Sequence, residues 1–365
     1  MKRGWRKALR ICVYATLGLV VVAAAVVFAA PQVLELPSIK AQLERRLSHV
    51  VNGQFAWERL EIHLLPSPRG EVGGVRIDIP GKLQARAEKV EAQIRLLPLL
   101  RGQVEIVSLT ALQPQMRLQL AAVTAPPQES KPAIDPFAVY RSAAGAAVGV
   151  VRAFAPETVL AVRDAVLEIH MTGRLPLRLH GLSLRSRTGH NGMDLELTTA
   201  SEHWSRLRLD ARVEYADLSG NATLEVDELR PQAWLDPMLA GAPVRIEIPM
   251  TGLRLKARTD GQGTLNCDFD SITPGVEVSQ GTRHWRLPEA VVKGKAHADA
   301  ERASVTLDEV LLGGEKLVQG TVRYAIASGA VEGDIGFDLD LARTLALARR
   351  ALPESEQESC RRRDR

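Results

Sequence analysis

Apolar and polar residues alternate along much of the chain, beginning near residue 54. Successive side chains of a β-strand point to opposite faces, so a period of two indicates a strand with one apolar face. The segment "FAWERLEIHLL" follows this period, and so do "GGVRIDIP" and "EKVEAQIRL". The apolar positions are Leu60, Ile62 and Leu64, then Val75, Ile77 and Ile79, then Val90, Ala92, Ile94 and Leu96. The chain is therefore expected to be mainly β from this point.

The same pattern returns after residue 157 and continues almost to the C-terminus. Examples are "AVLEIHM", "SRLRLDARVEY", "ATLEV", "VRIEIPM", "LRLKART" and "AVEGDIGFDLDLA". Turn residues such as Ser219-Gly220-Asn221, Asp260-Gly261 and Gly313-Gly314 separate several of these segments, as successive antiparallel strands require. We expect on the order of fifteen strands. The alternation leaves open whether the apolar face lines an open groove or packs on a second sheet in a sandwich.

The N-terminus carries a different signal, an uncharged run from Ile11 to Ala30 that includes Leu17, Val20, Val26 and Phe28. Twenty helical residues span roughly the 30 Å of a bilayer core. Five Lys and Arg residues precede the run, and such a flank stays in the cytoplasm. The pattern favours a retained signal anchor over residues 11–30. A cleaved signal peptide is the alternative, since Val27-Phe28-Ala29 offers small residues at a possible cleavage site.

Three further segments are predicted to be helical. The first, "LPSIKAQLERRLSHVVNG", has Ser38 as a possible N-cap and an apolar stripe that ends near Gly53. The second, residues 137–155, follows a Pro- and Ala-rich linker and ends at Pro156. It could be read as a second membrane span, but Arg141 and Arg152 bracket only ten residues, too few to cross a bilayer. The third is a short helix within residues 342–365, before a charged tail.

The predicted organisation follows from these boundaries. Residues 1–10 form a cytoplasmic basic segment, 11–30 the anchor, 31–120 a helix and first β block, and 121–156 the linker and helix. Residues 157–341 form a second β block, and 342–365 the short helix and tail. On this topology the N-terminus is cytoplasmic and everything after the anchor lies on the far side of the membrane.

The charge distribution argues against a nucleic-acid partner, and the cysteines argue against a fold stabilised by disulfides or zinc. The net charge is +4, but the cations that produce it lie at the two ends, in the first ten residues and in "RRRDR". A nucleic-acid binder carries its basic patch on the folded domain, so nucleic acid is not expected as a partner. The three cysteines, Cys12, Cys267 and Cys360, are scattered, and they form neither a disulfide framework nor a zinc motif.

Catalytic motifs are also missing from the sequence. His170, His180 and His190 recur every ten residues, but this spacing is the repeat length of short strands, and a metal site is not expected. The acidic groups at Asp308, Glu309 and Glu315, and at Asp334, Asp338 and Asp340, are explained by a solvated strand face. No nucleophile, phosphate-binding loop or metal-binding helix motif is recognisable. We expect no enzymatic activity, no cofactor and no metal.

The stretch "LPLLRGQVEIVSLTALQPQMRLQL", residues 97–120, carries a patterned apolar face with no obvious reactive group. Together with "ERLEIHLLPSPRGEVGGVRI" and "ARAEKVEAQIRL", it resembles the N-terminal part of AsmA-family proteins. The resemblance rests most on Ala87-Glu88, Val90, Leu97-Pro98-Leu99-Leu100-Arg101-Gly102, Ile106, Leu109 and Pro114. "RPQAWLD" after "LSGNATLEVDEL" is similar to a later part of such proteins. This chain is shorter than the larger members of the family.

The resemblance implies an inner-membrane protein of a diderm bacterium with a long, curved antiparallel β-sheet in the periplasm. The sheet would form a groove that carries phospholipid acyl chains in outer-membrane biogenesis. The composition is compatible, because the apolar positions are mainly aliphatic and only 4% of residues are aromatic. About fifteen strands would make a groove of roughly 70 Å, which we expect to be too short to cross the envelope alone. The residues expected to line it are Val90, Ile94, Val104, Ile106, Leu118, Val244, Ile246, Ile248, Leu253 and Leu255.

Two alternatives stay open from the sequence. The apolar face could be the core of an ordinary sandwich. The protein could also be a scaffold that assembles other envelope proteins by adding strands to its sheet edge rather than by carrying lipid.

Overall fold

A computed structural model of the chain describes residues 53–63, 67–95, 105–120, 157–171, 176–240, 244–281, 283–326 and 328–337. It also describes eleven isolated positions, which are Ala41, Glu44, Arg45, Ser48, Pro98, Arg141, Ala144, Gly145, Val148, Gly149 and Ala242. The predicted anchor, most of the linker, the turn around Leu97–Gly102, Val104 and the C-terminal helix lie outside the described residues. Among the described residues, no helix is both long and apolar enough to cross a membrane.

The chain divides into two compact units. Unit 1 consists of Met1–Ala121 and Leu160–Pro176, and unit 2 of Ala122–Val159 and Leu177–Arg365. Both are built almost entirely from strands, twenty of which fall in the described residues. The mainly β prediction is therefore confirmed. The expected number of about fifteen was too low, partly because the single predicted segment "FAWERLEIHLL" overlaps two strands, β1 (Gln54–Ala56) and β2 (Arg59–His63). The short strand β12 (Arg245–Glu247) lies in the predicted segment "VRIEIPM".

Unit 1 is organised around a long hairpin of β3 (Arg69–Ile79) and β4 (Leu83–Ile94). Strand β1 and strand β2 (Arg59–His63) both pair with β3. Strands β5 (Ile106–Leu112) and β6 (Gln115–Leu120) both pair with β4. The hairpin is thus shared by two sets of neighbours, one along each half of its length.

The apolar residues of this hairpin change from one side to the other between its two halves. Val75 pairs with Ala87 and Ile77 with Ala85, whereas Val72 pairs with Val90. Along the unbroken strand β4, Ala85 and Ala87 point to the opposite side from Val90. The change falls at Gly74, whose φ of 65° favours glycine. The two halves therefore present their apolar residues to opposite faces of the sheet.

Unit 1 also contains a parallel pair, β6 with β7 (Val159–Met171), so the sheet is mixed rather than wholly antiparallel. Strand β7 belongs to unit 1 although it follows the predicted linker. A parallel pair needs a long crossover connection, and residues 121–158 provide one. Arg117 on β6 contacts Glu168 on β7 across the pair, with 3.3 Å between Nη2 and Oε2.

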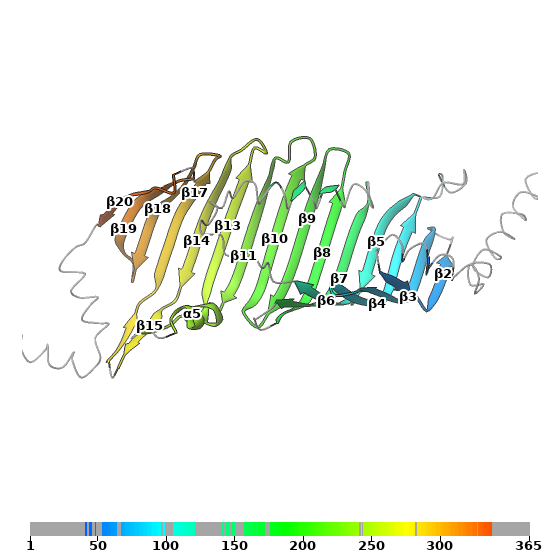
Figure 1. Cartoon of the computed structure of the whole chain (residues 1–365), viewed down its shortest axis with the longest axis horizontal. Coiled ribbons are helices and arrows are strands. Elements are labelled where there is room, and N and C mark those ends of the chain that lie inside the picture. The colour runs from blue at the N-terminus through cyan, green and yellow to red at the C-terminus, as the bar shows by residue number, and fades with distance from the viewer. Residues whose placement is uncertain are drawn as a thin grey trace, which may run out of the picture. The chain divides into compact units, whose positions relative to one another are not determined.

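Unit 2 contains ten strands that pair antiparallel in succession (Figure 1). They are β8 (Leu177–Thr188), β9 (Gly192–Ser201), β10 (Trp204–Glu214), β11 (Gly220–Leu229), β13 (Thr251–Thr259), β14 (Leu265–Thr273), β17 (Ala290–Ala298), β18 (Arg302–Leu312), β19 (Glu315–Ala325) and β20 (Val331–Phe337). Successive strands are mostly joined by short turns, as the turn residues predicted.

Two insertions interrupt this succession and meet at one end of the strands (Figure 1). Between β11 and β13 lie the helix α5 (Gln232–Met238) and the strand β12. Between β14 and β17 lie β15 (Val276–Gln280) and β16 (Arg283–Leu287). Strands β12, β15 and β16 form a separate antiparallel sheet of three strands, which we call the small sheet.

Candidate functional site

The pairing registers of unit 2 place apolar side chains in rows that run across the strands. One row contains Leu195, Ala211, Ala222, Ala257, Cys267, Ala296, Val305 and Val322. The neighbouring row contains Leu197, Leu209, Leu224, Leu255, Phe269, Gly294, Leu307, Gly320 and Ile335. Directly paired residues of a sheet point to the same side, so these rows define one face. We call it the apolar face.

The opposite face of the same strands is charged. Its side chains form ion pairs across neighbouring strands, such as Arg254 Nε with Glu225 Oε1 at 3.0 Å and Lys293 Nζ with Glu309 Oε2 at 2.9 Å. Hydrogen bonding to Glu309 raises the pKa of Lys293. Water solvates these side chains, and each such pair contributes little to stability. The two faces of this sheet thus have opposite chemistry along its length.

Part of the apolar face is open to solvent. The exposed fraction is 41% for Val305, 37% for Val322 and 49% for Ile335, three residues on consecutive strands. In a sandwich core the inner face of each sheet is covered by the other sheet. Within the described residues this end of the face has no such cover. The observation favours the open-groove interpretation over the sandwich for strands β18 to β20.

Comparison with known proteins bears on the N-terminal part of the chain. The AsmA family model matches residues 5–123. We call residues 5–123, which this family model matches, the AsmA segment. The match confirms the resemblance seen in the sequence and ends just after β6, so it covers about a third of the chain. No curated protein matches the chain closely enough to count as a relative.

The AsmA segment holds four described residues that were predicted to line a groove. Val90 pairs with Ala111 and Ile94 with Ile106, so these two positions share a side of the β4–β5 pair. Ile106 has an exposed fraction of 42%. Leu118 pairs with Leu83 instead. Leu83 lies in the half of β4 whose apolar residues point to the opposite side from Val90 and Ile94. The predicted set in the AsmA segment therefore divides between the two halves of the hairpin.

The predicted groove residues of unit 2 also separate. Leu253 and Leu255 lie on the apolar face, paired with Val226 and Leu224. Ile246 lies in the small sheet, where it pairs with Val278. Val244 immediately precedes strand β12 in the sequence, and Ile248 immediately follows it. These three residues are not part of the rows that define the apolar face.

Sequence reasoning missed the most exposed part of the face. Val305 and Val322 lie in "SVTLDEVLL" and "LVQGTVRY", and β18 carries two register shifts relative to β19. Such shifts interrupt a strict period of two, which hides the strand from a pattern search. The shorter alternation of Val318, Gly320, Val322 and Tyr324 was the available signal.

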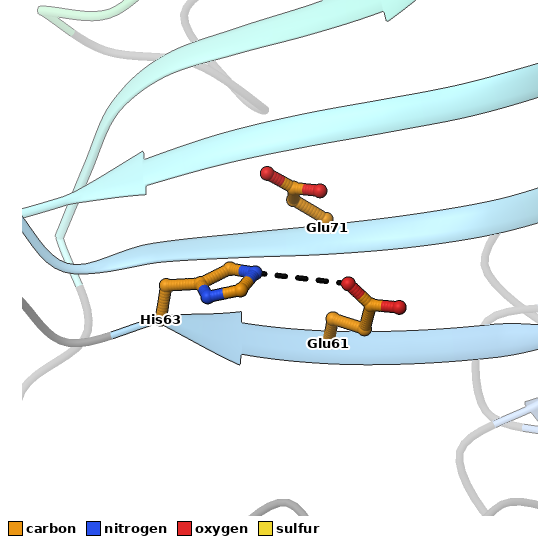
Figure 2. A group of neighbouring side chains, drawn as sticks. All are labelled: Glu61, His63 and Glu71. Atoms are coloured by element: carbon orange, nitrogen blue, oxygen red, sulfur yellow. Dashed lines mark ion pairs between the residues drawn. The ribbon is translucent and has the colours of Figure 1, made fainter.

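A second candidate site lies in the AsmA segment, where Glu61 and His63 on β2 face Glu71 on β3 (Figure 2). One potential ligand atom from each lies within 4.8 Å of the others. However, Lys89 Nζ lies 2.8 Å from carboxylate oxygens of both Glu71 and Glu91, and its hydrogen bond lowers the pKa of Glu71. The cluster already contains its own cation, so we interpret it as a cross-strand ion-pair network.

The three histidines spaced by ten residues do not converge. His170 lies near Glu168, with 3.7 Å between Nε2 and Oε2, and His190 lies near Glu157, with 3.8 Å between Nδ1 and Oε1. His180 pairs with Ala200 on the charged side of β8. Within the described residues, none of the three belongs to a group that could hold a metal ion.

Proposed function

We propose that this protein is a non-enzymatic, inner-membrane-anchored periplasmic protein whose apolar face takes up phospholipid acyl chains during outer-membrane biogenesis. The observation that carries the proposal is the row of apolar side chains that crosses unit 2 from β9 to β19 and is open at Val305 and Val322. AsmA-family sequence at the N-terminus is consistent with an envelope function related to lipid.

The chemistry of the face supports an acyl chain as its ligand. Its side chains are mostly aliphatic, with Phe269 as an exception, and offer few polar groups to orient a small molecule. Exposure of a sixteen-carbon acyl chain to water costs about 12 kcal/mol of transfer free energy, at about 0.8 kcal/mol per methylene. A face that continues across many strands can shield such a chain along its length. The polar headgroup would stay at the margin, in water.

The location is part of the proposal. The uncharged run at Ile11–Ala30 with its basic flank supports a single anchor with a cytoplasmic N-terminus. The AsmA family match begins at residue 5 and so includes this run. The two β units would then lie in the periplasm, next to the membrane that supplies the lipid.

Native mass spectrometry of the full chain, extracted from membranes with mild detergent, tests the proposal. The test variant is Val305→Glu with Val322→Lys, a directly paired set on the apolar face. The control is Thr306→Glu with Thr321→Lys, the next pair along the same strands, on the opposite face. Both place opposite charges side by side, which a strand pair tolerates, and the control residues also face Lys295 and Asp334.

The expected result is co-purified phospholipid in the unaltered protein and in the control, and its loss in the test variant. Circular dichroism verifies that both variants keep their strands. Phospholipid that remains bound to the folded test variant would contradict the proposal.

A second candidate is an assembly scaffold, which strand β20 favours. All seven of its residues are exposed, and Val331 and Phe337 reach 67% and 69%. An exposed strand of this kind can accept another strand. If strand addition is the function, prolines at Glu332 and Asp334 should impair the outer-membrane barrier while bound phospholipid is unchanged. If lipid handling is the function, the Val305 and Val322 variant should impair the barrier instead.

A further inference from the structure

The apolar face is closed at one end of unit 2. The pairing registers align Thr188, Met193, Val213 and Gly220 in a third row, on strands β8 to β11. Thr188 is 4% exposed and Met193 7%, whereas Val305 and Val322 on the same face of β18 and β19 are open. Something covers this row that does not cover the other end.

A helical segment of unit 2 reaches this row at the β10–β11 turn. Arg141, Ala144, Gly145, Val148 and Gly149 are helical, and their spacing places them along one side of a helix. Val148 is only 5% exposed. A Cβ built on Gly145 would lie 3.9 Å from Leu218 Cδ1, in the turn that connects β10 to β11. The helix therefore approaches one end of the row closely.

Further along the chain, Thr158 is hydrogen-bonded to Thr188 on β8, at the other end of the row. Thr158 N–H donates to Thr188 Oγ1 at 2.7 Å, Thr188 Oγ1 donates to Thr158 O at 3.0 Å, and Thr188 N–H donates to the same oxygen at 3.1 Å. Both threonines are buried, with exposed fractions of 3% and 4%. The chain thus approaches the β10–β11 turn at Gly145 and is hydrogen-bonded to β8 at Thr158, on the two sides of the covered row.

We infer that the helix around Gly145 and Val148 occupies the apolar face over strands β8 to β11 and confines acyl chains to strands β13 to β20. This inference rests on the proposed function, because it locates the lipid on the same face. The helix and an acyl chain compete for the same apolar side chains, so one part of the apolar face cannot hold both. This helix of the protein then determines how far along the apolar face a bound lipid can extend.

Two glycines on the same helix provide a matched test. Gly145→Glu places a long, charged side chain at the contact with Leu218 and is expected to displace the helix, whereas Gly149 is exposed and a Cβ added there would meet nothing within 4 Å. Gly149→Glu is therefore the control, with the same change in helix propensity. Photo-crosslinking residues at Val213 and, separately, at Val322 report phospholipid contact in the full chain extracted from membranes.

We expect lipid adducts at Val322 in every variant, and at Val213 in Gly145→Glu but not in the unaltered protein or in Gly149→Glu. Adducts at Val213 in the unaltered protein, or none there in Gly145→Glu, would overturn the inference. Absence of adducts at Val322 in every variant would reject the proposed function itself, and this inference with it. Cysteines placed at Gly145 and Leu218, in a background without the native cysteines, should be joined by a short bifunctional thiol crosslinker; absence of the crosslink would show that the helix does not lie there.

Discussion

Among single residues, Asp260 in the β13–β14 turn shows how one carboxylate organises local backbone. Asp260 Oδ1 accepts hydrogen bonds from the backbone N–H groups of Gln262, Gly263 and Thr264, at 2.9, 3.1 and 3.0 Å. Gly261, between them, has a φ of 71°, and a Cβ there would collide with the carbonyl oxygen of Asp217. The backbone hydrogen bonds favour the ionised carboxylate and lower its pKa from 3.8 to about 2.

This shift predicts a pH-dependent contribution to stability. Because the folded-state pKa is below the unfolded one, the contribution is present above pH 4 and is lost as the pH falls towards about 2. Asp260→Asn keeps an acceptor oxygen but cannot titrate. Urea unfolding followed by circular dichroism should therefore show a smaller loss of stability between pH 4 and pH 2 in this variant. Parallel pH profiles for the two proteins would contradict the assignment.

A second feature at this level is the pairing of Gly294 with Phe269 on the apolar face. A Cβ at Gly294 would lie 2.5 Å from Cζ of the Phe269 ring and would also collide with the carbonyl oxygen of Thr306. The missing side chain therefore makes room for the ring. Gly252, on β13, offers a contrast, because the nearest atom to a Cβ there would be the carbonyl oxygen of Ile272 at 3.8 Å.

Replacement of these two glycines by alanine should have different outcomes. Gly294→Ala forces the ring and a strand apart, and overpacking of this kind costs about 1 to 3 kcal/mol of unfolding free energy. Gly252→Ala meets no obstacle and should change the unfolding free energy by less than about 1 kcal/mol. Urea titrations of the full chain in detergent measure both. Recovery of Gly294→Ala by Phe269→Leu would identify the ring as the cause, and no recovery would point to the Thr306 carbonyl.

Among the secondary-structure elements, the small sheet is attached to α5 by one side chain. The Gln232 amide donates from Nε2 to Ile246 O at 3.1 Å, and its Oε1 accepts from Ile248 N–H at 3.2 Å. One amide thus satisfies both a carbonyl and an N–H at the ends of a three-residue strand. A strand as short as β12 has few other bonds to hold it, since β15 is its one neighbour among the described strands.

We therefore expect Gln232→Ala to loosen the small sheet selectively. Loss of two hydrogen bonds, each about 1 kcal/mol net, should speed amide exchange in the three strands of the small sheet, residues 245–247, 276–280 and 283–287, by up to about thirtyfold. Exchange in β17 to β19 should be unchanged. Hydrogen–deuterium exchange mass spectrometry measures this, with Gln262→Ala in an exposed turn as the control. Uniformly faster exchange across all strands would mean that Gln232 supports the whole unit.

For the molecule as a whole, the opposition between the two faces of the unit 2 sheet decides how a ligand would bind. The ion pairs lie on one face and the aliphatic rows on the other, as in the adjacent residues Arg254 and Leu255. A ligand held by the apolar face gains little from charge, so its binding should not respond to ionic strength. A ligand held by the charged face would respond strongly.

This separation predicts that bound phospholipid resists salt. The Debye length falls from about 10 Å at 0.1 M salt to about 3 Å at 1 M, which weakens headgroup contacts but leaves hydrophobic burial intact. Washing the immobilised full chain at both concentrations and quantifying extracted phospholipid should give equal amounts. The Val305→Glu, Val322→Lys variant gives the background level. A large loss of lipid at 1 M would place the ligand on charged residues instead.

Local sequence was enough to establish which residues share a face within a strand. A period of two is a local property of extended backbone, so the alternation predicted the mainly β fold and placed Leu253 and Leu255 together. The AsmA segment was also identifiable from sequence, because its apolar spacing and the residues that punctuate it are local in the chain. The same reasoning placed the short helical stretch at Gly145 and Val148, where the described positions are helical.

Which strands are neighbours, and what covers them, depended on the tertiary structure. Ile246 alternates like Leu255, yet it pairs with Val278 in the small sheet, because strand pairing depends on backbone hydrogen bonds between segments distant in sequence. Leu118 and Val90 have similar local patterns, yet Leu118 on β6 pairs with Leu83, in the half of β4 whose apolar residues point to the opposite side from Val90. Met193 is buried and Val322 is open on the same apolar face, because burial depends on which distant segment packs there rather than on the residue itself.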